Sequence, residues 1–190
     1  MDYGSPDYVV TSRPDIAYAV NFMSQFNSCY TVDHWKAAKR ILRYLSGTKT
    51  VGLLFKQTGD DLYGAAISWE ARKQRTVALS STESEYLAMS EAVKEALYLK
   101  ALLNRMGLKF KCVSIFNDNQ SAQHLVKGFG FHPPTKHIDV RHHFIQEMHK
   151  SGDISVEYMQ TERMPADVLT KGLGGQKHNE CSASLGLISI

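Results

Sequence analysis

The order of the apolar segments after residue 80 constrains this chain most. A long amphipathic pattern predicts a helix from about Thr82 to Met106. The apolar run Val113–Phe116 and the alternating run Ile154–Tyr158 predict two strands. Helical patterns over Gln120–Lys127 and Lys136–Lys150 lie between those strands. Strands that alternate with helices indicate the α/β class, with a mixed sheet (α+β) flanked by helices.

The first 50 residues predict a pair of helices. Pro14 fits the first turn of a helix, where its missing N–H costs nothing. A second helix is expected from about Val32 to Leu45, with Asp33 as its cap. Its apolar stripe comprises Trp35, Ala38, Ile41, Leu42 and Leu45, and Lys36, Lys39, Arg40 and Arg43 lie mostly off that stripe.

The middle and the end of the chain predict shorter elements. Strands are expected at Val51–Phe55 and Ala65–Trp69, and a turn at Gln57–Asp61. Pro165–Lys171 predicts a short helix, and residues 176–190 predict a loose tail.

Composition narrows the function classes without selecting one. With 43% hydrophobic and 22% charged residues, the 190-residue chain has the balance of a globular protein. Its net charge of +3 is compatible with a polyanionic partner and equally with none. Three widely spaced cysteines argue against a disulfide framework or a cysteine zinc site and favour a reducing compartment, the cytoplasm or the nucleus. Neither a secretory signal nor a membrane span is expected.

Three carboxylates stand where secondary structure is expected to change: Glu85, Asp118 and Asp167. Carboxylates gathered at the carboxyl ends of strands can bind Mg²⁺, and two such ions can drive phosphodiester hydrolysis. Each residue also has a purely structural interpretation. Thr82 and Glu85 have the spacing of a capping box, Asp118 or Asn119 could cap the next helix, and Asp167 could complement a helix dipole.

Several stretches are similar, in the same order, to motifs of one known family. They are VALSSTESEY at 77–86, DNQSA at 118–122, TKHIDVR at 135–141 with HFI at 143–145, TE at 161–162 with ADVLTK at 166–171, and, upstream, RPDIAYAV at 13–20 and HWKAAKRILRYL at 34–45. Those after residue 76 resemble the ribonuclease H of copia-type LTR retrotransposon Pol polyproteins. The two upstream stretches resemble the end of the reverse transcriptase that precedes it.

The resemblance implies a ribonuclease H-like fold that cleaves the RNA strand of RNA–DNA hybrids, with two Mg²⁺ ions held by four carboxylates. Glu85, Asp118 and Asp167 match three of those catalytic, metal-binding carboxylates. Residues 1–50 would then be a remnant of the reverse transcriptase thumb or connection region, 51–175 a truncated ribonuclease H-like domain and 176–190 a tail. The implied partners are a hybrid or other nucleic acid and the rest of the polyprotein.

The chain departs from the family between Gly64 and Ala65. The family's first strand, with a motif like SDADWAG, and a following strand like RSTSGYVF are absent there. Without the first aspartate, the two ions lose the ligand they share, so we expect impaired or no hydrolysis. Asp60 and Asp61 lie upstream in a turn and are expected to be solvated rather than to substitute.

Basic residues offer candidate nucleic-acid contacts. They are Lys73, Arg75, Lys136, His137 and Arg141, and a solvated surface explains them equally well. The histidines at 132–149 do not have the spacing of a zinc site. Two alternatives to an impaired ribonuclease stay open: a non-catalytic nucleic-acid-binding module, and a non-functional transposon remnant.

Overall fold

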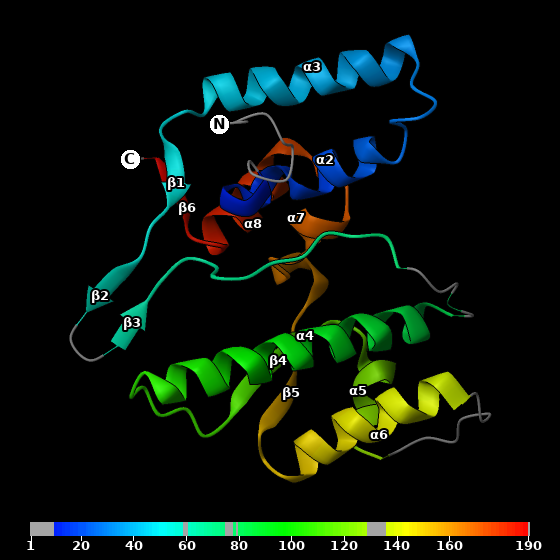
Figure 1. Ribbon diagram of the computed structural model, residues 1–190, viewed down its shortest axis with the longest axis vertical. Coiled ribbons are helices and arrows are strands. Elements are labelled where there is room, and N and C mark those ends of the chain that lie inside the picture. The colour runs from blue at the N-terminus through cyan, green and yellow to red at the C-terminus, as the bar shows by residue number, and fades with distance from the viewer. Residues whose placement is uncertain (1–9, 59–60, 75–77, 79, 129–135, 190) are drawn as a thin grey trace. The chain divides into compact units, whose positions relative to one another are not determined.

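A computed structural model of the chain describes residues 10–58, 61–74, 78, 80–128 and 136–189 (Figure 1). The chain divides into two compact units. Unit 1 comprises Met1–Gln74 and Pro165–Ile190, and unit 2 comprises Arg75–Met164.

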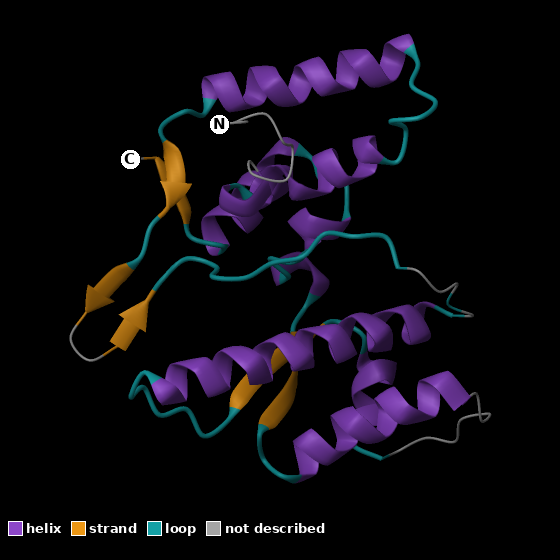
Figure 2. Ribbon diagram, viewed as in Figure 1, coloured by secondary structure: helices purple, strands orange, loops and turns teal. Residues whose placement is uncertain are grey.

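Unit 2 is a parallel strand pair surrounded by helices (Figure 2). The strands β4 (Val113–Asn117) and β5 (Ile154–Tyr158) pair from Val113 opposite Ile154 to Asn117 opposite Tyr158. The helices are α4 (Ser81–Arg105), α5 (Gln120–Val126) and α6 (Lys136–Lys150), and the 3₁₀ turn η2 (Thr161–Arg163) follows β5. Parallel strands need a crossover connection, and α5 and α6 lie within it.

The core of unit 2 joins all three helices to β5. Its buried residues are Tyr86, Met89, Val93, Ala122, Val126, Ile145, Ile154 and Val156. The first three lie on α4 at steps of three and four residues, so one face of that helix is buried. Burial also raises the pKa of Tyr86.

Unit 1 combines helices from both ends of the chain with two small antiparallel sheets. Its helical elements are η1 (Pro14–Ile16), α2 (Ala17–Ser24), α3 (Val32–Gly47), α7 (Asp167–Thr170) and α8 (Gly175–Ser184). Strand β1 (Val51–Leu53) pairs with β6 (Leu187–Ser189), and β2 (Lys56–Thr58) pairs with β3 (Asp61–Tyr63).

A buried ion pair fastens the beginning of unit 1 to α3. Arg13 donates to both carboxylate oxygens of Asp15, at 2.9 and 2.7 Å, and also to the backbone carbonyl and hydroxyl of Thr48. The Tyr44 hydroxyl donates to Asp15 at 2.7 Å. Burial alone would raise the pKa of Asp15, but these hydrogen bonds outweigh it and hold that pKa below its usual value. Burial and the contact with Asp15 raise the pKa of Tyr44 to about 12.

The structure confirms the α/β class and most predicted elements, including both helices of the first 50 residues and both strands of unit 2. The described residues form three two-stranded sheets, so the ribonuclease H-like fold stays a prediction. The division at residues 74 and 165 cuts across the predicted domain boundaries at 50 and 175, which stay an interpretation by family.

Two predictions about secondary structure were wrong. Ala65–Trp69 is not a strand, because in the described chain it has no strand beside it, although the backbone N–H of Ala66 donates to Leu185. Residues 176–190 are not a loose tail, because α8 and β6 pack into unit 1. Gly186 makes this approach possible: its φ is +84°, and a Cβ there would collide with Ala65.

Candidate carboxylate site in unit 2

Glu85 lies in the second turn of α4, close to the end of β4. The N-cap of α4 is Ser80, whose hydroxyl accepts from the backbone N–H of Glu83. The predicted capping box of Thr82 and Glu85 was therefore wrong, and Glu85 is not needed to start the helix. Its carboxylate instead accepts a hydrogen bond of 3.4 Å from the side-chain amide of Asn117.

Asp118 follows the last residue of β4. The sequence left open whether Asp118 or Asn119 caps α5, and the structure assigns that role to Asn119, whose side chain accepts from the N–H of Ala122. Asp118 accepts a hydrogen bond of 2.9 Å from the hydroxyl of Thr161, which begins η2 after β5. Asp118 thus lies where the carboxyl ends of two parallel strands meet, the usual ligand position in such sheets.

Asn117 organises this end of the sheet, and no role was predicted for it. It is buried, and its side chain donates to Glu85 and accepts from the backbone N–H of Asn119. Its carbonyl accepts from the Gln123 side chain and from the N–H of Met159. A polar residue at the end of an apolar run was visible in the sequence, but its partners are distant in the chain. We call Glu85, Asn117, Asp118 and Thr161 the strand-end cluster.

Asp167 belongs to unit 1. It is the first residue of α7, it is buried, and its carboxylate forms an ion pair of 2.7 Å with Lys171. The structure therefore places Glu85 and Asp118 together in one unit and gives Asp167 a cationic partner within the other. Asp167 is the first residue of α7, where a carboxylate complements the helix dipole, as the structural interpretation had it; its ion pair with Lys171, which follows the helix, was not predicted.

The strand-end cluster does not fit a two-ion metal site. It contributes two carboxylates, and no group of three histidine, cysteine, aspartate or glutamate side chains that could hold a metal occurs in the described part of the chain. Asp60 lies outside the described residues, as does the side chain of Asp61, so neither is placed as a substitute ligand.

The structure describes only some of the side chains that were predicted to contact nucleic acid. Lys73 is exposed, Arg75 lies outside the described residues, and the side chains of Lys136 and His137 are not described. Arg141 donates to Glu91 at 3.0 Å, which neutralises part of its charge. These residues stay predictions.

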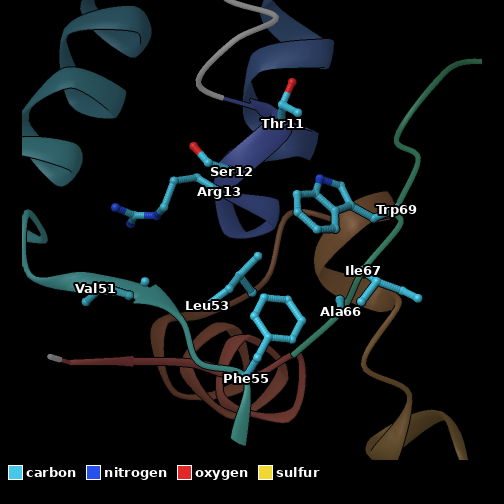
Figure 3. Close-up of a pocket in the computed structure, with 10 residues that line it drawn as sticks. Thr11, Ser12, Arg13, Val51, Leu53, Phe55, Ala66, Ile67 and Trp69 are labelled. Atoms are coloured by element: carbon cyan, nitrogen blue, oxygen red, sulfur yellow. The ribbon is translucent and has the colours of Figure 1, made fainter. Parts of the chain in front are cut away.

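An open groove of about 490 Å³ lies in unit 1 (Figure 3). The groove is lined by residues 11–13, which precede η1, by residues 51–55 in and after β1, and by residues 66–69. They carry the half-exposed Phe55 and Ile67 beside Trp69, whose indole donates to the carbonyl of Val10. None of the predicted catalytic carboxylates lines the groove. In the described residues, no helix is both long and apolar enough to cross a membrane.

The chain is similar to several curated proteins. It is 38% identical to the retrovirus-related Pol polyprotein from transposon TNT 1-94 of Nicotiana tabacum, over 95% of this chain and 16% of the relative. It is 34% identical to the Pol polyprotein from transposon RE2 of Arabidopsis thaliana, over 98% of this chain and 15% of the relative. It is 42% identical to the secreted RxLR effector protein 161 of Plasmopara viticola, over 51% of this chain and 87% of the relative. The chain thus spans about one sixth of the Pol polyproteins that it matches. No family model and no solved structure matches it.

The alignments reveal residues that this chain lacks. The match to the tobacco protein spans 206 positions, whereas 95% of 190 residues is about 180, so about 26 positions of the relative have no counterpart here. For the RE2 protein, 214 positions against 98% of 190 leave about 28. Strands average about five or six residues, so the unmatched positions are together enough for two strands and their connections.

Proposed function

Because the chain belongs to the copia-type retrotransposon Pol polyproteins, we propose that it is the ribonuclease H end of such a polyprotein and that this copy hydrolyses RNA–DNA hybrids poorly or not at all. The effector of Plasmopara viticola matches half of this chain, whereas the Pol polyproteins match 95–98% of it, so the polyprotein is the better guide to ancestry. In the parent element, the rest of the polyprotein is the partner and the hybrid is the substrate.

The strand-end cluster is the observation that carries the ribonuclease ancestry. Two residues that match the family's carboxylates, Glu85 and Asp118, are 33 residues apart in the chain, and both lie at the carboxyl end of β4. Neither caps a helix, because Ser80 and Asn119 do that. Structural demands on α4 and α5 therefore do not explain these two carboxylates, which favours inheritance from a site.

The loss of hydrolysis is supported by the composition of the same cluster. By family resemblance, Mg²⁺ is the cofactor, and Glu85, Asp118 and Asp167 match three of the carboxylates that hold it. Of these, Glu85 and Asp118 belong to the cluster, and Asp167 lies in unit 1 with Lys171 as its partner. A two-ion site depends on a ligand shared by both ions, and the absent segment after Gly64 is where the family carries that aspartate. The positions of the tobacco relative that have no counterpart here total about 26, which is as many as such a loss requires.

A cleavage assay tests the proposal. The purified chain is incubated with Mg²⁺ and an RNA–DNA hybrid whose RNA strand is end-labelled, beside the variants Asp118→Asn and Glu85→Gln. We expect all three proteins to give the same background. Cleavage by the natural chain that disappears in Asp118→Asn would show that the site is still active and would overturn the proposed inactivity.

The hybrid contacts proposed for this region are Lys73, Arg75, Lys136, His137 and Arg141. Because Arg141 is already bonded to Glu91, we expect it to contribute less to binding than Lys136. Filter binding of Arg141→Gln and Lys136→Gln tests that order, and a larger loss for Arg141→Gln would reverse it.

A further inference from the structure

Large apolar side chains lie exposed around the groove of unit 1 (Figure 3). Phe55 is 54% exposed and Ile67 is 60% exposed. Val51, Leu53 and Phe55 are spaced by two residues, and so are Ile67 and Trp69. This is the spacing at which the side chains of an extended segment share one side. Apolar side chains gathered in this way mark a surface that another polypeptide covers.

The groove borders the point at which this chain departs from the family. Gly64 is the last residue before the departure, and it lies against the ring of Phe55: a Cβ on Gly64 would be 2.9 Å from Phe55 Cδ1. Ala66 and Ile67, which follow the departure, line the groove. A segment inserted between Gly64 and Ala65 would therefore begin and end beside the groove.

The lining of the groove suits an uncharged occupant. Among the described residues that line it, Arg13 is the one with a charged side chain. Its guanidinium is bound to Asp15 at 2.7 Å, and its side chain is only 10% exposed. A charged group entering the groove would lose hydration without gaining a countercharge, whereas apolar side chains would be favoured there.

The motif given above for the second absent strand has this chemistry. RSTSGYVF is uncharged after its first residue. Its Tyr and Phe are two positions apart, so they share one face of an extended strand. Extended peptides gain specificity by placing alternate side chains in pockets of the protein that binds them.

We propose that the groove is a docking surface for the segment that this chain lacks after Gly64, donated by a second polypeptide such as an intact Pol polyprotein. The aromatic side chains of the donated strand cover Phe55, Ile67 and Trp69. The inference rests on the departure after Gly64 and not on the catalytic state of the chain, because docking requires no hydrolysis.

The fluorescence of Trp69 tests the proposal in the full chain. Trp69 lines the groove, and Trp35→Phe removes the other tryptophan, which lies on α3. A synthetic peptide of sequence RSTSGYVF with blocked ends is titrated against this protein. A second peptide, RSTSGYFV, exchanges the last two residues and thereby places Tyr and Phe on opposite faces of a strand.

Two variants of the protein provide the matched comparison. Ile67→Asp changes the groove, and Leu42→Asp changes α3 at a position of similar exposure, 63% against 60%. Because both side chains are exposed, neither change should unfold unit 1, and circular dichroism verifies this.

We expect RSTSGYVF to change the emission of Trp69 saturably and Ile67→Asp to weaken its binding by about tenfold or more, because a carboxylate replaces an apolar contact. Leu42→Asp should leave the affinity unchanged within about twofold, and RSTSGYFV should bind roughly fivefold more weakly.

The absence of a saturable change with RSTSGYVF would overturn the proposal, as would equal losses in the two variants. Equal binding of the two peptides would also overturn it, because the groove would then attract apolar groups without selecting a strand. Cleavage of a hybrid by the natural chain would contradict the proposed inactivity but would leave these results unchanged.

Discussion

Each unit contains a polar cluster with carboxylates, and the two clusters differ in the charge of the groups that bind those carboxylates. In unit 1, the side chain of Asp15 is 1% exposed and is bound by a guanidinium and a phenol. In unit 2, an uncharged amide reaches Glu85 and an uncharged hydroxyl reaches Asp118. Asp15 is thus bound by a positively charged group of the same chain. The hydrogen bonds from Asn117 to Glu85 and from Thr161 to Asp118 come from uncharged groups.

This difference is the one expected if Asp15 supports folding and if Glu85 and Asp118 derive from a site, as proposed. A buried charge must be paired and hydrogen-bonded, and Arg13 meets that demand for Asp15. Glu85 and Asp118 are partly exposed and lie at the edge of the sheet, where an external cation could approach them. Under the proposed function, Glu85 and Asp118 are what is left of a metal site that has lost its shared aspartate, and the following predictions test that contrast.

The largest effect is expected from breaking the buried ion pair. Asp15→Asn leaves Arg13 without its countercharge in a buried setting, which should lower the free energy of unfolding of unit 1 by roughly 3–5 kcal/mol. Both tryptophans, Trp35 and Trp69, belong to unit 1, so tryptophan fluorescence in urea follows its unfolding. Asp33→Asn breaks an exposed pair in the same unit and should cost less than about 0.5 kcal/mol. Similar losses for both variants would contradict the structural role of Asp15.

Protonation of Asp15 in acid should also destabilise unit 1, gradually as the pH falls. The pKa of Asp15 is held below its ordinary value of 3.8, so its stabilising effect is present above that pH and is lost as the pH falls through the lowered pKa. Thermal melting of unit 1 between about pH 6 and pH 2 should therefore show a drop in Tm at the acid end. Asp15→Asn should remove that component of the pH dependence; an unchanged acid profile in the variant would assign it to other carboxylates.

A smaller effect should distinguish the two neighbours at the end of β4. Asn119→Ala removes the cap of α5 and should cost about 1 kcal/mol. Asp118→Ala removes a side chain with no capping role, so it should cost less than about 0.5 kcal/mol. Urea unfolding followed by circular dichroism measures both. If Asp118→Ala were the more damaging change, Asp118 would be a structural residue and the comparison between the units would fail.

The smallest expected effect concerns the start of α4. Ser80→Ala should destabilise the helix by about 0.5–1 kcal/mol, because the hydroxyl of Ser80 satisfies the N–H of Glu83. Thr82→Ala should be close to neutral, because Thr82 lies inside the helix. Thermal melts of the two variants decide between them, and a reversed order would restore Glu85 to a capping box.

Local patterns predicted the elements of unit 2 well. The helices α4, α5 and α6 and the strands β4 and β5 each have their own apolar periodicity, and the α/β class follows from their order. The caps were predicted less well. Ser80 and Thr82 both precede a glutamate by three residues, and Thr31 rather than Asp33 caps α3 through a reciprocal contact with His34. Sequence spacing alone does not distinguish between such neighbours.

Contacts between segments that are distant in the chain could not be predicted from the sequence. The polar segment that forms α8 has little apolar periodicity, yet it buries Cys181 and Ser182 and leads into β6. Ala65–Trp69 is strand-like in composition but does not form a strand, since a strand depends on a partner. For the candidate site, the sequence predicted Glu85 and Asp118 but not the buried Asn117, which contacts Glu85 across 32 residues of the chain.

The decisive experiment restores the segment that the family carries after Gly64. The stretch of the tobacco Pol polyprotein with the family's first aspartate is inserted between Gly64 and Ala65, and Mg²⁺-dependent cleavage of an RNA–DNA hybrid is measured for the natural and the restored chain. We expect no cleavage by the natural chain and cleavage by the restored chain that Asp118→Asn abolishes. Cleavage by the natural chain that depends on Asp118, or a folded restored chain that remains inactive, would contradict it.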